Sequence, residues 1–67
     1  MPLKPKVRPM GQHVVLVNSV RSSRGPIPVG RETTIEGIHI DENSRVHYKI
    51  EYQRTYVWVV AADLKKA

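Results

Sequence analysis

The chain contains no cysteine, so neither a disulfide nor cysteine-bound zinc can stabilise its fold. Its three histidines are scattered along the sequence and do not form a tetrahedral ligand set. The length of 67 residues allows one domain. Chains this short typically draw only ~3 to 5 kcal/mol of stability from their core. We therefore expect a fold held by packing or by self-association, with no metal and no other cofactor.

Long apolar runs are also absent. No stretch approaches the roughly 18 apolar residues of a membrane span, and the amino terminus lacks the apolar run of a signal peptide. A very small secreted domain without cysteine would be unusual. The sequence therefore predicts a soluble, cytoplasmic protein.

Acidic residues are missing from the first thirty positions, which makes the formal charge of +5 asymmetric along the chain. Residues 31–67 carry six residues of each sign. Clustered Lys and Arg raise a positive potential that gathers phosphates or carboxylates. The asymmetry predicts a negatively charged partner, either nucleic acid or an acidic protein surface. The cations of the first thirty positions are Lys4, Lys6, Arg8, Arg21 and Arg24.

Helical spacing of apolar residues is absent after Gln12, where short runs of β-branched residues alternate with turn-forming residues. This pattern is typical of an all-β protein. A short helical turn is expected at residues 62–64. The predicted strands span residues 12–20, 31–40, 45–51 and 54–61.

Two segments outside these strands are rich in residues that interrupt regular structure. Residues 1–10 alternate prolines with Lys or Arg, which predicts a flexible, basic, extended arm. Such an arm either contacts phosphates or only aids solubility. Residues 21–30 contain serines, prolines and glycines, which predicts an exposed loop.

The hairpin between the second and third predicted strands has a register that the apolar pattern selects. A loop at residues 42–44 places Asp41 opposite Arg45 and gathers five large side chains on one face. Burial of each such side chain contributes about 1.5 to 3 kcal/mol. This exceeds the contribution of the Glu36–Lys49 pair that the alternative register would form. The five side chains are Ile38, Ile40, Val46, Tyr48 and Ile50.

The following turn is expected at Tyr52 and Gln53. This position would set Tyr48 opposite Val57 and Val46 opposite Val59. The inner face would then also receive Val57, Val59 and Ala61.

The opposite face of the same strands is a candidate binding surface. There the predicted register places His39 opposite His47, His47 opposite Trp58, and Lys49 opposite Tyr56. Interleaved aromatic and cationic side chains can stack on bases while the cation contacts phosphate. Trp58 could instead cover one end of the core. His39 and His47 form a candidate pH-sensitive pair, because both would charge and repel below about pH 6.5.

Three short stretches resemble the SH3-like small β-barrel superfamily. They are the opening with Gly11, Val14 and Leu16, the stretch 28–30 before the second strand, and the ending 57–64. The resemblance covers about residues 11–64 and implies one barrel of about five short strands at 11–67. Within it, residues 21–30 and 41–44 take the places of the loops that flank an SH3 ligand groove.

The chain departs from the eukaryotic SH3 domains that bind Pro-rich peptides. It lacks their Ala-Leu-Tyr-Asp-Tyr stretch, acidic first loop and paired tryptophans. It also lacks the Val-Gln-Ile-Tyr motif of the type II dihydrofolate reductases, which are short SH3-like chains. No set of base, orienting partner and nucleophile is visible, so we expect no enzymatic activity.

Small SH3-like barrels occur in nucleic-acid-associated proteins of transcription, translation, and phage or plasmid biology. With the basic arm and loop, this resemblance implies a nucleic-acid-binding module. The alternative is an accessory protein that docks on an acidic surface of a protein partner, and exposed sheet edges would also allow a homo-oligomer. The candidate binding residues for either partner are Lys4, Lys6, Arg8, Arg21, Arg24, Arg31, Lys49, Tyr56 and Trp58.

Overall fold

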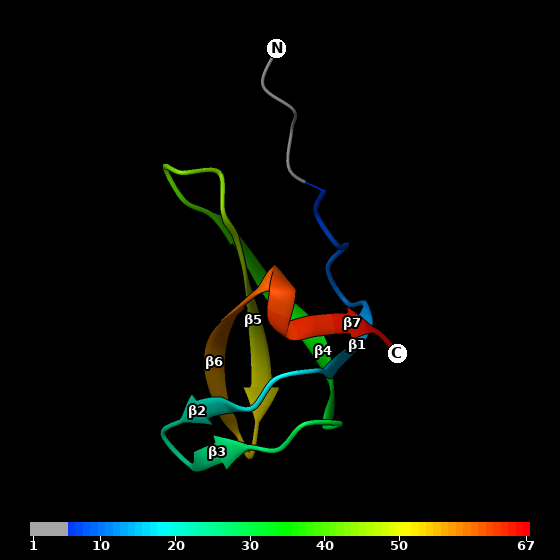
Figure 1. The fold of residues 1–67 in the computed structure, drawn as a ribbon, viewed down its shortest axis with the longest axis vertical. Helices are drawn as coiled ribbons and strands as arrows, with labels where there is room; N and C mark the ends of the chain where they lie inside the picture. Colours follow the sequence, from blue (N-terminus) through cyan, green and yellow to red (C-terminus); the bar gives the residue numbers. More distant parts are fainter. Residues whose placement is uncertain (1–5) are drawn as a thin grey trace.

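The computed structural model describes residues 6–67, which form an all-β fold without an α-helix, as predicted (Figure 1). The predicted helical turn is present as a 3-10 helix, η1 (Ala61–Asp63). No helix in this part of the chain is long and apolar enough to cross a membrane. The strands are β1 (His13–Leu16), β2 (Val20–Ser22), β3 (Gly25–Ile27), β4 (Glu32–Ile40), β5 (Val46–Tyr52), β6 (Thr55–Val60) and β7 (Leu64–Lys66).

Five strands form one sheet in the order β6-β5-β4-β1-β7, and β2 and β3 form a separate hairpin. All of the described strand pairs are antiparallel. Within residues 6–67, β6 and β7 are the edges of the large sheet, so hydrogen bonds do not close it. Figure 1 shows the β4–β5 hairpin extending past η1 toward one end of the molecule, while β2 and β3 lie at the other.

The prediction of an exposed loop at residues 21–30 is wrong in part: most of the segment is exposed, but β2 and β3 pair there and Ile27 is completely buried. The Ser22 side chain stabilises the tight turn by donating to the Gly25 carbonyl (2.7 Å) and accepting from the Arg24 amide (3.1 Å). Gly25 has a φ of 98°, which glycine adopts without strain. The serine and glycine content therefore marks a hairpin turn rather than a loop.

The register predicted for the β4–β5 hairpin is confirmed. His39 pairs with His47, and the Asp41 amide donates to the Arg45 carbonyl (3.0 Å) across the three-residue loop. Ser44 in this loop has a φ of 63°, as such loops require. One expected core residue, Ile40, is instead 47% exposed, because the end of the hairpin projects beyond the other strands.

A β-bulge interrupts the pairing of β4 with β5. Ile35 pairs with Ile50 and Gly37 with Lys49, which leaves Glu36 as an extra residue. Side chains alternate between the faces of a strand, so without this bulge Ile35 and Ile38 would lie on opposite faces. With the bulge, Ile35 is buried and Ile38 packs against the same core.

The turn predicted at Tyr52 and Gln53 is wrong by one residue, because the turn contains Gln53 and Arg54. Tyr52 pairs with Thr55, and the two turn residues have φ values of 48° and 65°. The Tyr52 ring is buried and cannot occupy a turn. The strand pairing consequently shifts by two residues, which preserves the faces of both strands because side chains alternate with a period of two.

The core lies on the inner face of the large sheet and includes Ile27 from the small hairpin. Contrary to expectation, Ala61 is exposed, whereas Val57 packs against the core from the inner face as predicted. The buried residues are Val14, Leu16, Ile27, Ile35, Val46, Tyr48, Ile50, Tyr52, Val59 and Leu64.

Candidate binding surface

Two aromatic side chains project from the outer face of β6. Trp58 is 50% exposed and Tyr56 is 56% exposed, so Trp58 does not cap the core. The two-residue shift sets Trp58 opposite Lys49 and Tyr56 opposite Glu51. The predicted cross-strand partners of both rings are therefore wrong, while their predicted face is correct.

The Lys49 ammonium connects the two rings. Its Nζ lies 5.1 Å from the centroid of Tyr56 and 5.9 Å from that of Trp58. Both separations are within the range of cation–π attraction, which holds a positive charge beside exposed ring faces. We call Lys49, Tyr56 and Trp58, with their neighbours His39 and His47, the aromatic platform.

Gly37 provides the space in which the platform packs. A Cβ atom at this position would lie 3.1 Å from both Cβ and Cε of Lys49 and 3.6 Å from Cη2 of Trp58. The indole thus reaches across β5 to β4, where its edge meets His39 with 6.2 Å between ring centroids. Sequence analysis missed Gly37, although a glycine inside a strand is a known signal of close approach.

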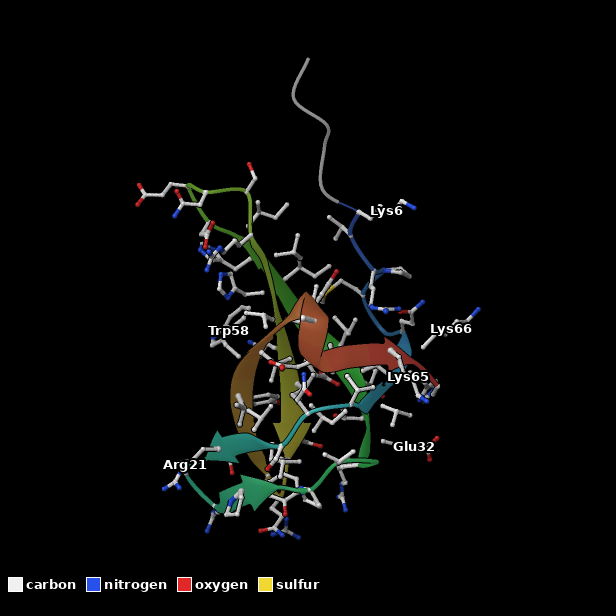
Figure 2. All side chains as sticks on the ribbon, viewed as in Figure 1. Lys6, Arg21, Glu32, Trp58, Lys65 and Lys66 are labelled. Carbon is white, nitrogen blue, oxygen red and sulfur yellow. The ribbon has the colours of Figure 1, made fainter. Side chains whose placement is uncertain are left out.

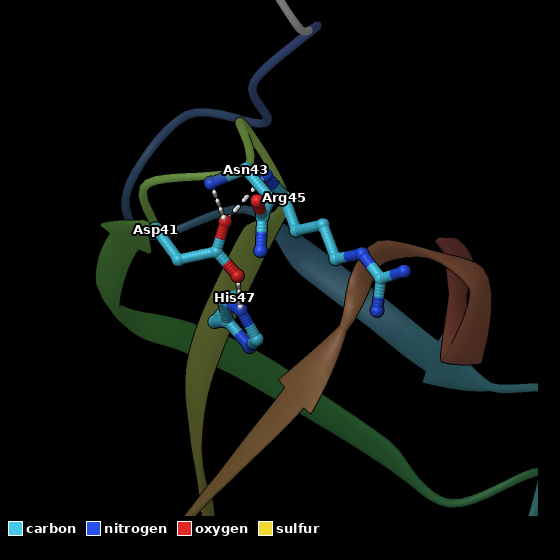
Figure 3. Close-up of polar contacts among 4 residues, drawn as sticks. All are labelled: Asp41, Asn43, Arg45 and His47. Atoms are coloured by element: carbon cyan, nitrogen blue, oxygen red, sulfur yellow. Dashed lines mark hydrogen bonds and ion pairs between the residues drawn. The ribbon is translucent and has the colours of Figure 1, made fainter.

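A histidine and a carboxylate pair at one end of the platform (Figure 3). His47 Nε2 donates to Asp41 Oδ2 at 3.0 Å, and Asp41 Oδ1 accepts the backbone N–H groups of Asn43 and Arg45 at 2.8 and 2.9 Å. The pKa of Asp41 is lowered from 3.8 to about 2, mainly by the hydrogen bond from His47. The two backbone hydrogen bonds lower the pKa further, whereas desolvation raises it. A carboxylate only accepts, which assigns the proton to Nε2.

The Asp41 carboxylate lies beside the two histidines of the predicted pair. The His39 and His47 rings lie 5.9 Å apart, and a shallow cavity of about 340 Å³ is lined by both histidines, Asp41 and Trp58. Among residues 6–67, no group of three or more His, Asp or Glu side chains is arranged to hold a metal ion.

Three arginines lie near the start of β6, in the β2–β3 hairpin and in the turn between β5 and β6. Arg21 and Arg24 belong to the β2–β3 hairpin, and a 3.2 Å hydrogen bond between the Ser23 and Thr55 hydroxyls joins that hairpin to β6. Arg54 occupies the adjoining turn. Sequence analysis missed Arg54, although its position two residues before Tyr56 indicates proximity to the platform. Figure 2 shows Arg21 and Trp58 on the same side of the molecule.

The other predicted cations do not join this group. Lys6 lies on the opposite side from Trp58, together with Lys65 and Lys66 (Figure 2). Arg31 stacks on the ring of Tyr52 with 5.3 Å from its guanidinium carbon to the centroid. Lys4 lies outside the described residues.

Arg8 is tied to the inner face of the sheet. Its backbone N–H donates to the Tyr48 hydroxyl at 2.8 Å, and its guanidinium donates to Oε1 of Gln12 at 3.1 Å. Gly11 and Gln12 then exchange backbone hydrogen bonds with Ile35. The described end of the predicted arm thus contacts the fold before β1 begins.

No ion pair between a lysine or arginine and a carboxylate is present within residues 6–67. Comparison with protein-family models, with curated proteins and with solved structures gave no match. The function is therefore inferred from the chemistry of the chain's own surface.

Proposed function

We propose that this protein is a non-enzymatic module that binds single-stranded nucleic acid on its aromatic platform. One observation supports the proposal above all others. Two half-exposed rings, Tyr56 and Trp58, occupy alternate positions of one strand, and the Lys49 ammonium lies against both. Aromatic rings beside a cation form a surface for bases and phosphates together.

The spacing of the rings suits consecutive unpaired bases. Residues two apart on a strand are separated by about 6.7 Å, so each ring can receive one base of an extended strand. Stacking of a base on such a ring contributes about 1–3 kcal/mol and tolerates any base. A duplex keeps its bases stacked inside the helix, so the platform favours single strands.

The phosphates in this proposal are contacted by Lys49 and by Arg21, Arg24 and Arg54 at the start of β6. None of these four forms an ion pair within the described residues, so their charges are available to a ligand. Lys6 lies on the opposite side from Trp58 and contributes only to long-range attraction.

We also propose that the fold is an SH3-like barrel. The strand order, with β1 between β4 and β7, and the 3-10 turn that leads into β7 agree with the resemblance in the sequence. The β2–β3 hairpin occupies the place of the long first loop. An open hydrogen-bonding order is compatible with a barrel whose remaining gap is filled by side chains.

Trp58 is the only tryptophan, so its fluorescence reports binding directly. Titration with single-stranded and duplex oligonucleotides at two salt concentrations should show quenching that is stronger with single strands and weaker in salt. Unchanged fluorescence with single strands at low salt would contradict the proposal.

A matched pair of variants tests the assigned path of the phosphates. Arg54→Ala and Lys66→Ala remove the same charge, one beside the platform and one on the other side. With a labelled single strand, Arg54→Ala should reduce the slope of log affinity against log salt by about 0.7, the value for one contact with a single strand. Lys66→Ala should leave the slope unchanged, and equal effects of the two variants would refute the path.

A further inference from the structure

A second concave surface lies around η1 and begins beside the His47 end of the aromatic platform, because Val60, which lines it, pairs with His47. Two shallow cavities, of about 410 and 330 Å³, are both lined by Ala61 and therefore adjoin. We call them together the η1 groove. Lys6, Val7, Arg8, Pro9, Gln12 and Tyr48 line the larger cavity, and Arg45, Val46, Val60 and Ala62 line the smaller one.

The walls of the η1 groove are mostly aliphatic. Val7 and Val60 are among the exposed large apolar residues, and Pro9 and Val46 add further apolar surface. The groove is open because the side chains of η1 that line it are the methyl groups of Ala61 and Ala62. Aliphatic walls of this kind fit aliphatic side chains, whose burial contributes about 25 cal/mol per Å².

The charged residues that line the η1 groove are all cations. Lys6 and Arg8 line one cavity and Arg45 lines the other, with no Asp or Glu among the lining residues. Figure 3 shows the Arg45 side chain extending away from the Asp41 carboxylate.

The one carboxylate on η1 has other hydrogen-bond partners. Asp63 accepts from the Asn18 amide at 3.1 Å and from the Val60 backbone N–H at 3.3 Å. The cations of the η1 groove therefore have no carboxylate of this chain as a partner within the described residues. An incoming acidic group could pair with them.

We propose that the η1 groove binds an acidic segment of a partner protein, with aliphatic side chains in the two cavities and carboxylates on Arg8 and Arg45. A nucleic acid fits less well, because no exposed aromatic ring lines the groove. Tyr48 is the one aromatic residue there, and it is only 1% exposed. The groove shares no lining residue with the platform and takes a different ligand, so the proposal does not depend on the proposed function.

The test uses the full chain, labelled with ¹⁵N, and a short synthetic peptide that alternates glutamate and leucine. Titration should shift the amide resonances of Ala61, Ala62 and Val46 and leave those of Tyr56 and Trp58 in place. Two control peptides separate the contributions, one with lysine replacing glutamate and one with serine replacing leucine. Both controls should bind at least about tenfold more weakly, since each removes one of the two complementary features.

A larger side chain at Ala61 offers a second test, because it would occupy the space that the peptide needs. Ala61 is exposed, so Ala61→Leu should leave the fold intact while its side chain occupies both cavities and weakens peptide binding by about tenfold or more. Trp58→Ala serves as the control and should bind the peptide normally. The proposal is overturned by no shifts at millimolar peptide, by shifts centred on the platform, or by equal binding of the lysine peptide. It is also overturned if a single-stranded oligonucleotide produces the shifts at Ala61 instead.

Discussion

The aromatic platform and the η1 groove carry the same sign of charge but different apolar surfaces. The platform places cations beside exposed rings, whereas the groove places cations beside aliphatic side chains and small alanines. Positive charge attracts phosphates and carboxylates alike. The neighbouring apolar group therefore decides the class of ligand, since rings stack on bases and aliphatic cavities receive aliphatic side chains.

The largest expected effect is a loss of oligonucleotide affinity when the platform loses its tryptophan. Trp58→Ala should lower the affinity for a single-stranded oligonucleotide by about 1–3 kcal/mol, because one stacked base loses its ring. Fluorescence anisotropy of a labelled oligonucleotide measures this loss. Peptide binding at the η1 groove should not change, and a parallel loss at both sites would mean that the two surfaces are one.

Gly37 tests whether the packing beneath the platform matters. Gly37→Ala brings a Cβ to 3.1 Å from Lys49 Cβ and Cε, so the lysine must move by a few tenths of an ångström and the variant should lose about 1 kcal/mol of stability. Oligonucleotide affinity should fall as well, because Lys49 and Trp58 no longer share the space over β4. Chemical denaturation and anisotropy give the two values.

A second substitution tests whether the stability lost in Gly37→Ala arises from its contact with Lys49. Lys49→Ala removes the flexible part of the contact, so the double variant should recover part of the stability lost in Gly37→Ala. Full additivity of the two changes would show that Gly37 does not act through Lys49.

Tyr48→Phe should affect the groove side alone. It keeps the buried ring but removes the hydroxyl that accepts the Arg8 N–H at 2.8 Å. Loss of one such bond costs about 0.5–1.5 kcal/mol of stability. Peptide binding should weaken because Arg8 is released, while oligonucleotide affinity should stay the same. A loss of oligonucleotide affinity in this variant would contradict the separation of the two surfaces.

The smallest effect concerns pH and Asp41. Because the folded-state pKa of about 2 lies below the ordinary 3.8, the ionised form is favoured by folding. The resulting stability is fully present above about pH 3.8 and disappears as the pH falls through about 2.

Asp41→Asn removes this contribution at every pH. Thermal unfolding of the two proteins should show a lower midpoint for the variant at neutral pH, with the difference shrinking between pH 3.8 and 2. A difference that stays constant over this interval would assign the effect to the turn geometry instead.

The sequence predicted the β4–β5 hairpin because its apolar residues alternate and a one-residue slip would expose them. The same reasoning placed Tyr56 and Trp58 on the outer face even though their partners were wrong by two residues, because a shift of two preserves the face. The second turn could not be located, since Tyr52 and Gln53 are as plausible in a turn as Gln53 and Arg54 until Tyr52 is known to be buried.

The candidate site was predicted in composition but not in arrangement. The cations were evident from charge, yet the sequence could not show that Lys6 and Trp58 lie on opposite sides of the molecule. It could not show that Ser23 brings the β2–β3 hairpin to Thr55, which groups Arg21 and Arg24 with Arg54. Contacts between residues more than thirty positions apart depend on how the strands assemble.

Local physical chemistry therefore determined the all-β class, the faces of β5, of β6 and of the part of β4 after its bulge, and the excess of positive charge, because alternation and turn chemistry act over a few residues. Tertiary structure alone decided the exposure of Ile40, the packing of Trp58 over Gly37, and the separation of platform from groove. Each of these depends on which strands lie side by side and where the sheet ends, and neighbouring residues in the sequence do not encode that.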